Sequence, residues 1–188
     1  ERNARQNELI AAARASARLT DQLLQLERLR YGNTGPVTRF DLNQIVKEVC
    51  EAMVPAALTR DLDFTLDRFD GPLMMDGDPV LIGEALTNLV ENALRHGGDG
   101  MTQITVRTKR TENMIVVMVE DDGIGIPLDQ ADTAFRRFSQ LRNGEGTGLG
   151  LAFVQQVVSR HNARVRLVEV GKGTLVRLDL PAAVEDPA

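Results

Sequence analysis

Cysteine is scarce in this chain and an excess of basic charge is lacking, and each feature excludes a class of protein. Cys50 is the only cysteine, so no disulfide can form within the chain. No cysteine and histidine cluster has the spacing of a zinc site, which favours a reducing, cytoplasmic setting. The 22 basic residues are outnumbered by 27 acidic ones, giving a net charge of −5. This balance offers no basic surface for nucleic acid or for direct contact with an anionic membrane.

Long apolar runs are also missing. No stretch approaches the ~18 consecutive apolar residues that would span a bilayer, and the first residues do not form a signal peptide. The chain starts on Glu1, not Met, inside a helical pattern. We therefore expect it to be a piece of a longer protein, with any membrane anchor or sensor in the missing part.

The first thirty residues predict one long helix. Apolar or small residues recur in steps of three and four, at Leu9, Ala12, Ser16, Leu19, Leu23 and Leu26. This stripe predicts packing on other helices, as half of a helical hairpin that dimerises into a four-helix bundle; the alternative is a helix that only caps its own domain. Turn residues at 31–36 predict a boundary. The expected organisation is helix and linker at 1–35, a domain at 36–183 and a tail at 184–188.

From Val37 onward, helical and extended patterns alternate. Asp41 and Asp78 are the expected N-caps of two helices, the first with Pro55 as a kink or end, the second from Pro79 to about His96. A third helix is expected at about 148–160. Extended segments are predicted at 61–66, 73–75, 103–109, 114–120, 164–170 and 174–180, with the nearly apolar 114–120 in the sheet's centre. The predicted fold is a two-layer α/β sandwich with a mixed sheet.

Four short segments carry most of the information about function. They are Asn-Leu-Val-Glu-Asn-Ala at 88–93, Asp-Asp-Gly-Ile-Gly at 121–125, Phe-Arg-Arg-Phe at 135–138 and Gly-Thr-Gly-Leu-Gly-Leu at 146–151. Their order and spacing resemble the N, G1, F and G2 boxes of the Bergerat ATP-binding fold, shared by gyrase-type ATPases, heat-shock chaperones and sensor histidine kinases. The flanking sequence, including Gly-Lys-Gly-Thr at 171–174, looks specifically like bacterial sensor histidine kinases. The resemblance implies that the chain binds ATP with Mg²⁺.

The first box places two asparagines on one face of a helix. Asn88 and Asn92 are four residues apart, and their amide oxygens can ligate a hard cation. Standing alone, the pair would fit a solvated helix face equally well. The resemblance implies that Asn92 is the Mg²⁺ ligand and that Asn88 assists through the metal's water. Gyrase-type members carry a glutamate at the Asn88 position, so a dedicated hydrolase is disfavoured, although Glu84 and Glu91 remain open as substitute bases.

The helix that carries this box ends on a basic pair. Arg95 and His96 match family positions that approach the phosphates and the adenosine, which implies a catalytic role for Arg95 and nucleotide contact for His96. A helix C-terminal cap is the alternative for His96.

The second box follows an apolar strand. Asp121 ends that strand, where a carboxylate can accept a hydrogen bond from the exocyclic amine of adenine, which would set base specificity. Gly123 and Gly125 let the backbone approach a ligand closely, and Ile126 is expected to provide an apolar wall.

The glycine-rich run forms the expected phosphate loop. Gly146, Thr147, Gly148, Leu149 and Gly150 precede or open a helix, where backbone N–H groups are exposed to phosphate. The spacing fits neither a Walker loop nor a Rossmann turn.

The segment 128–145 resembles the ATP lid of the kinases. Arg137 and Gln140 are expected near phosphate oxygens. Phe135 and Phe138 are expected to hold the lid against the body of the domain or against the helical bundle, with simple core packing as the alternative.

One departure from the family qualifies the resemblance. Kinases of this type carry a phosphoacceptor histidine on the first hairpin helix, but this chain has only His96 and His161. We therefore expect the catalytic portion of a sensor histidine kinase, acting in trans: it would transfer the γ-phosphoryl group of ATP to a histidine, for relay to the receiver domain of a response regulator.

The resemblance also implies a full-length protein that is a homodimer through the N-terminal helix and is anchored in the bacterial inner membrane. Three other functions stay open. They are a non-catalytic nucleotide-binding regulatory module, a gyrase or mismatch-repair ATPase, and an anti-sigma-type serine kinase.

Overall fold

The computed structural model describes residues 20, 23, 24, 26, 27, 35–139 and 147–184. The chain divides into two compact units, Glu1–Thr34 and Gly35–Ala188. In the first unit the described residues are helical, as predicted. The predicted stripe positions Leu9, Ala12, Ser16 and Leu19 lie outside the described residues. Within the described part of the chain, no helix combines the length and the apolar character needed to cross a membrane.

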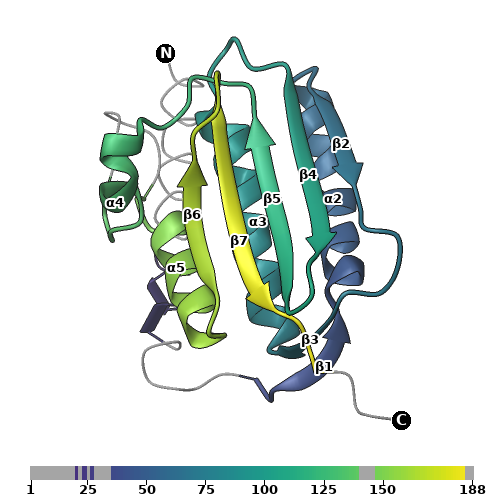
Figure 1. Cartoon of the computed structure of the whole chain (residues 1–188). Helices are drawn as coiled ribbons and strands as arrows, with labels where there is room; N and C mark the ends of the chain where they lie inside the picture. Colours follow the sequence, from purple (N-terminus) through teal and green to yellow (C-terminus); the bar gives the residue numbers. More distant parts are fainter. Residues whose placement is uncertain (1–19, 21–22, 25, 28–34, 140–146, 185–188) are drawn as a thin grey trace, which may run out of the picture. The chain divides into compact units, whose positions relative to one another are not determined.

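The second unit is built on a mixed five-stranded sheet, as predicted (Figure 1). Its strands are β2 (Asp63–Asp67), β4 (Gln103–Arg110), β5 (Met114–Asp121), β6 (Arg164–Val168) and β7 (Thr174–Pro181), in the order β2-β4-β5-β7-β6. Only the β2–β4 pair is parallel. The apolar strand β5 is the third of the five strands and lies in the centre of the sheet, as predicted.

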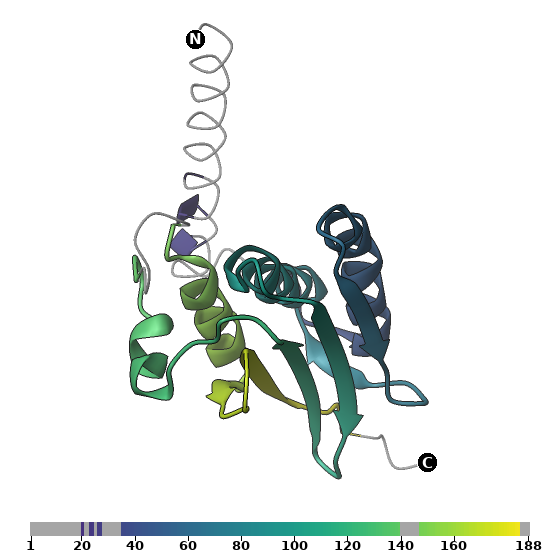
Figure 2. The ribbon, with the colours of Figure 1, turned by 90° about the horizontal axis from the view of Figure 1, so that it is seen from above.

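Three helices cover one face of this sheet (Figure 2). They are α2 (Leu42–Thr59), α3 (Pro79–His96) and α5 (Gly150–Arg160), and α3 packs between the other two. The core lies between the layers; its largest fully buried side chains include Phe153, Leu89 and Ile104. Cys50 belongs to this core, and burial raises its pKa to about 12, so it serves packing and has no nucleophilic role.

The helix starts follow from their caps. Asp41 accepts a hydrogen bond from the N–H of Asn43, and Asp78 accepts from Val80 and Leu81, which satisfies backbone donors that the helices leave unpaired. Pro55 does not end α2: the helix continues to Thr59. The prediction of an end at Pro55 was therefore wrong.

A second, smaller sheet was not predicted. β1 (Thr38–Asp41) pairs antiparallel with β3 (Met74–Gly77) at the end of the domain where α2 begins. The backbone N–H of Leu42 also donates to the Leu73 carbonyl at 2.9 Å. The short strand β1 ends at Asp41, the N-cap of α2, and its pairing partner is far away in the sequence.

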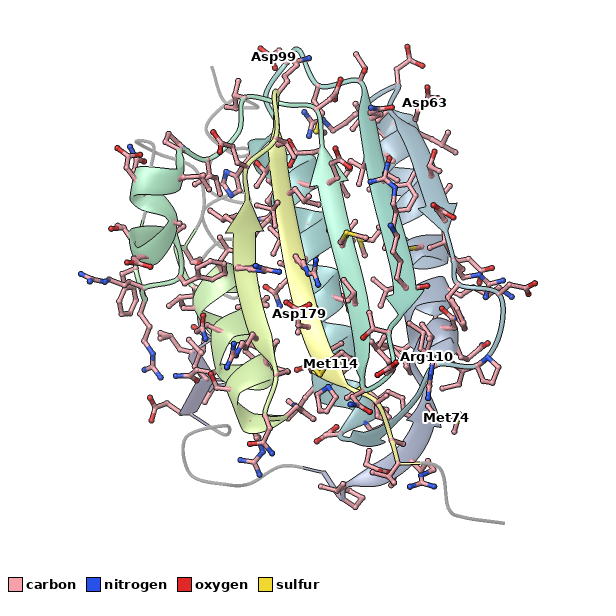
Figure 3. The ribbon with its side chains drawn as sticks, viewed as in Figure 1. Asp63, Met74, Asp99, Arg110, Met114 and Asp179 are labelled. Carbon is pink, nitrogen blue, oxygen red and sulfur yellow. The ribbon has the colours of Figure 1, made fainter. Side chains whose placement is uncertain are left out.

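The other face of the main sheet carries no helix in the described structure. Met114 on β5 and Asp179 on β7 lie on this face (Figure 3), opposite the core-facing residues of the same strands. Charged side chains pair across the strands there: Arg107 with Glu120, and Arg166 with Asp179 at 3.6 Å. The functional residues predicted from the sequence lie elsewhere, where the helical layer meets the end of β5.

Candidate nucleotide site

The two predicted asparagines face the first residue of α5. A Cβ added to Gly150 would lie 3.2 Å from the Oδ1 atom of both Asn88 and Asn92. The end of α5 reaches the start of α3 instead, where the His161 imidazole accepts from the Asp78 N–H. The two helices therefore run antiparallel, with both amides at the α5 start. The predicted common face of Asn88 and Asn92 is confirmed.

The amide of Asn88 is held in one orientation. Its Nδ2 donates to the Glu84 carbonyl oxygen, one turn earlier, at 2.9 Å. The assigned oxygen is therefore the atom directed toward Gly150, where it can accept from water or ligate a cation. Both asparagines are half-buried, so they keep a face open to a ligand.

The first turn of α5 differs from the first turns of the other two long helices. α2 and α3 each have an aspartate that caps the helix, but in the described structure no side chain caps α5. The hydroxyl of Thr147 accepts from the N–H of Leu149 at 3.3 Å, and Gly148 has a φ of +66°, which turns the chain into the helix. Uncapped N–H groups at a helix N-terminus suit phosphate. Gly146 lies outside the described residues.

Asp121 is a buried carboxylate at the end of β5. It is 5% exposed and accepts from the N–H of Gly123 at 3.0 Å. Burial raises its pKa; hydrogen bonds from Gly123 and from the side chain and backbone of Thr174 offset this only in part. In a buried site such as this, a carboxylate can accept a hydrogen bond from a neutral N–H donor because water competes little for that donor.

Thr174 is a site residue that the sequence reasoning missed. It is paired with Asp121 across β5 and β7. The available signal was the Gly-Lys-Gly-Thr segment at 171–174, which contributed to the family resemblance but was given no role in the site.

The turn after Asp121 packs directly on the end of α3. The N–H of Ile124 donates to the Gly97 carbonyl at 3.0 Å, and Gly123 lies against the Gly97 backbone. Gly125 has a φ of +74° and approaches Gly173. The structure thus shows close approaches of Gly123 and Gly125 to the chain's own backbone, and their predicted approach to a ligand stays a prediction. Ile126, the expected wall, is half-buried.

The basic pair at the end of α3 and the lid residues differ in their exposure. Arg95 and His96 form the exposed last turn of α3, one turn beyond Asn92. Arg137 is half-buried, and Gln140 lies outside the described residues. Phe138 is 61% exposed and has a φ of +61°.

The lid segment includes two short helices that the sequence did not predict, the 3₁₀ helix Leu128–Gln130 and α4 (Ala131–Ala134). Phe135 follows α4 and lines a groove of about 470 Å³ with Gln155 of α5 and Val165 and Leu167 of β6. Phe135 therefore lies against the body of the domain, which is one of the two expected positions.

The donor set fits a magnesium nucleotide. Two amide oxygens converge near Gly150, next to uncapped backbone donors. Within the described part of the chain, no group of three or more histidine, cysteine or acidic side chains could hold a metal ion by protein ligands alone. Mg²⁺ typically takes few protein ligands and completes its shell with water and substrate phosphates, which matches this arrangement.

Comparison with known proteins agrees with this geometry. Residues 77–184 match the family described as histidine kinase-, DNA gyrase B- and HSP90-like ATPases. The sensor-like histidine kinase SenX3 of Mycolicibacterium smegmatis is 31% identical over 180 residues, covering 92% of this chain and 46% of that protein. The sensor histidine kinase RppB of Synechocystis is 32% identical over 176 residues, covering 89% and 38%. The chain thus spans less than half the length of these relatives.

Two solved structures share the fold. The mycobacterial sensor histidine kinase MprB is 27% identical, with a TM-score of 0.67 over 78% of this chain and 98% of that one. The histidine kinase ThkA, solved in complex with the response regulator protein TrrA, is 20% identical, with a TM-score of 0.70 over 89% of this chain and 49% of that one. With residues 77–184 matched and the site assembled at the α3–α5 end, the chain belongs to the histidine kinase-, gyrase B- and HSP90-like ATPase family and carries the ATP-binding catalytic domain of a sensor histidine kinase.

Proposed function

We propose that this domain binds Mg-ATP at the α3–α5 end and transfers the γ-phosphoryl group to a histidine on a helical hairpin. The observation that carries the proposal is the convergence of the Asn88 and Asn92 amide oxygens on Gly150, at the uncapped start of α5. In this proposal Asn92 ligates Mg²⁺ directly, and Asn88 assists through a metal-bound water. The N–H groups of the first α5 turn receive phosphate oxygens.

The remaining contacts divide between the base and the phosphates. Asp121 accepts from the exocyclic amine of adenine, with Thr174 beside it. Arg95, His96 and Arg137 approach the phosphates and the sugar. Charge on the transferring phosphoryl group is spread over its oxygens, so cations and backbone donors around it are the main protein contribution.

The reaction requires an acceptor histidine from outside the residues of this site. A histidine nitrogen would attack the γ-phosphorus while the bond from phosphorus to the β–γ bridging oxygen breaks, and ADP would leave with that oxygen. His96 lies on α3 and His161 caps the end of α5, so neither is placed on a dimerisation hairpin. We therefore propose phosphorylation in trans, on a supplied hairpin.

The wider assignments rest on relatives. The complex of ThkA with TrrA supports a response regulator receiver domain as the partner that takes the phosphoryl group onward. Residues 1–35 are proposed as the second helix of the dimerisation hairpin and 36–183 as the catalytic domain, in a full-length homodimer. We propose a cytoplasmic position for this part of a membrane-anchored sensor.

The first test is calorimetric titration of the 188-residue chain with ADP and a non-hydrolysable ATP analogue, with and without Mg²⁺. Asn92→Ala is expected to abolish the Mg²⁺-dependent gain in affinity, and Asp121→Ala to weaken both nucleotides. Absence of binding under every condition would refute the proposal.

The second test separates catalysis from simple nucleotide binding. The chain is mixed with γ-labelled ATP and a separately purified hairpin carrying an acceptor histidine; acid-labile label is expected on the hairpin and not on the chain itself. Binding without transfer would favour the non-catalytic regulatory module. Rapid ATP hydrolysis without the hairpin would favour a gyrase-type ATPase, which the asparagine at position 88 disfavours.

A further inference from the structure

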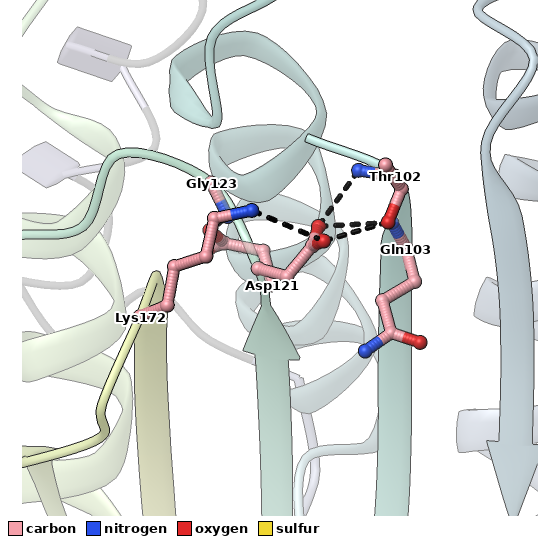
Figure 4. A network of polar contacts seen from close by, with 6 residues as sticks. Thr102, Gln103, Asp121, Gly123 and Lys172 are labelled. Atoms are coloured by element: carbon pink, nitrogen blue, oxygen red, sulfur yellow. Dashed lines mark hydrogen bonds and ion pairs between the residues drawn. The ribbon is translucent and has the colours of Figure 1, made fainter. Parts of the chain in front are cut away.

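Asp122, the residue after the carboxylate proposed to bind adenine, bonds to Thr102, Gln103 and Lys172, the three network residues labelled around this turn in Figure 4. Its Oδ1 accepts from the N–H groups of Thr102 at 2.7 Å and Gln103 at 3.0 Å. Its Oδ2 accepts from the Thr102 hydroxyl at 2.6 Å and lies 3.5 Å from Nζ of Lys172. These donors, led by the Thr102 hydroxyl, hold the pKa of Asp122 well below its usual range, so the group is ionised.

The network joins segments that are far apart in the sequence. Thr102 and Gln103 lie where the α3–β4 loop enters β4, whereas Lys172 is at the tip of the β6–β7 hairpin. Asp122 is therefore bonded on one side to β4 and on the other side to the hairpin.

The hairpin tip makes two further contacts with the same turn. Gly173 lies against the Asp121 backbone, because a Cβ on Gly173 would come within 1.8 Å of the Asp121 carbonyl oxygen. Thr174 bonds to the Asp121 carboxylate. Three consecutive hairpin residues thus each contact the Asp121–Asp122 pair, and Asp122 adds the ties to β4.

Asp121 and Asp122 have different surroundings. Asp121 is 5% exposed and bonded to Gly123 and Thr174, whereas the Asp122 side chain is 20% exposed and bonded to Thr102, Gln103 and Lys172. Successive residues at a strand end point to opposite sides, so Asp122 is not on the side that receives the base. Any effect of Asp122 on the base must therefore pass through the position of Asp121.

We infer that Asp122 is a positioning residue for base recognition: by clamping the strand end between β4 and the hairpin tip, it fixes the Asp121 carboxylate where the adenine amine arrives. The inference rests on the proposed function. A hydrogen bond from the base to Asp121 is sensitive to shifts of the carboxylate by a few tenths of an ångström. The proposed phosphate and metal contacts are made at the start of α5, by residues outside this turn.

The test compares affinity for ADP with affinity for inosine diphosphate, which has a carbonyl oxygen where adenine has its amine. Asp122→Ala is expected to reduce the preference for ADP about 10-fold, through weaker ADP binding, while the Mg²⁺-dependent gain is kept. Asp122→Asn keeps an oxygen for both backbone N–H groups and is expected to retain the preference within about threefold. Asp70→Asn, at an exposed position in the loop before β3, is the matched control.

A second variant keeps the test decisive if Asp122→Ala does not fold. Thr102→Val preserves the β-branched shape and removes only the hydroxyl donor; an intermediate loss of ADP preference is expected. Unchanged preference in Thr102→Val and in a folded Asp122→Ala, or an equal loss for both nucleotides, would overturn the positioning role alone. A wild-type chain without ADP preference would overturn the assignment of Asp121 to the base, and with it this inference.

Discussion

The imidazole of His161 accepts a hydrogen bond from the backbone N–H of Asp78 at 3.0 Å, across 83 residues of sequence. The other ring nitrogen, Nδ1, lies 2.7 Å from the Val157 carbonyl oxygen and must donate to it. The ring is therefore neutral, with its proton on Nδ1, and it ties the end of α5 to the start of α3.

Removing this ring is expected to cost stability. His161→Ala leaves the Asp78 N–H without its acceptor, so the free energy of unfolding should fall by about 1–3 kcal/mol. Urea denaturation with an unchanged m-value measures it. His161→Gln, whose side-chain oxygen can accept the same bond, should recover part of the loss. Equal stability of His161→Ala and the wild type would contradict the structural role of the tie.

Gly150→Ala is expected to harm metal binding without harming the fold. The new Cβ would lie 3.2 Å from both amide oxygens, so Asn88 and Asn92 must shift by a few tenths of an ångström. We expect the Mg²⁺-dependent gain in nucleotide affinity to fall about 5- to 10-fold, a change of roughly 1 kcal/mol. Calorimetric titration with and without Mg²⁺ measures it.

Gly83→Ala in α3 is the matched control for that substitution. Its Cβ would make an ordinary 3.5 Å contact with Ile45, so it should stabilise the helix by about 0.5–1 kcal/mol and leave Mg²⁺ dependence unchanged. A similar loss of Mg²⁺ dependence in both variants would show that the effect is not specific to the asparagine pair.

Asp121→Asn is expected to raise the stability of the fold and to lower the affinity for ADP. Because burial raises the pKa of Asp121 above its usual value of 3.8, the folded state holds this proton more tightly than the unfolded chain does. The resulting stability is fully present below about pH 3.8 and is lost as the pH rises through the raised pKa. Near pH 7, Asp121→Asn should therefore raise the Tm by about 2–4 °C.

Nucleotide binding should change in the opposite direction. The ionised carboxylate is the better acceptor for the adenine amine, so ADP affinity of the wild type should rise with pH as Asp121 ionises. Asp121→Asn should bind ADP at least about 10-fold more weakly and lose this pH dependence. A variant with wild-type affinity would exclude Asp121 from base recognition.

Gly123→Ala tests the close approach between the turn and α3. A Cβ there would come within 2.2 Å of the Gly97 carbonyl oxygen, so backbone on both sides must move, at a cost of about 2–4 kcal/mol. Gly100→Ala meets nothing within 4 Å and should change stability by less than about 0.5 kcal/mol. Thermal unfolding of the two variants side by side measures the difference.

The sequence predicted the elements that are defined by local signals. Asp41 and Asp78 predicted the starts of α2 and α3, because both residues are good N-caps. The i, i+4 spacing placed Asn88 and Asn92 on one face of α3. The apolar strand β5 was recognised as central for the same reason: its pattern is complete within eight residues.

What the sequence did not predict depends on pairing over long distances. Strand β1 exists because it pairs with β3, 36 residues later, and its own four residues carry no strand pattern. The contacts of Thr174 and Asp122 likewise follow from the register between β5 and β7 and from the entry into β4, neither of which local spacing encodes.

The packing of α3 against α5 places Gly150 beside both asparagines, and the Asn88 amide is bonded to Glu84 within α3. Most of the conformational entropy lost in bringing these groups together is therefore lost when the domain folds. Under the proposed function, binding would need little rearrangement of α3 and α5, so more of the interaction energy with the metal and phosphates would appear as affinity. The packing of α3 against α5 would therefore fix the shape of the proposed site in advance and select the nucleotide by its complementarity to that shape.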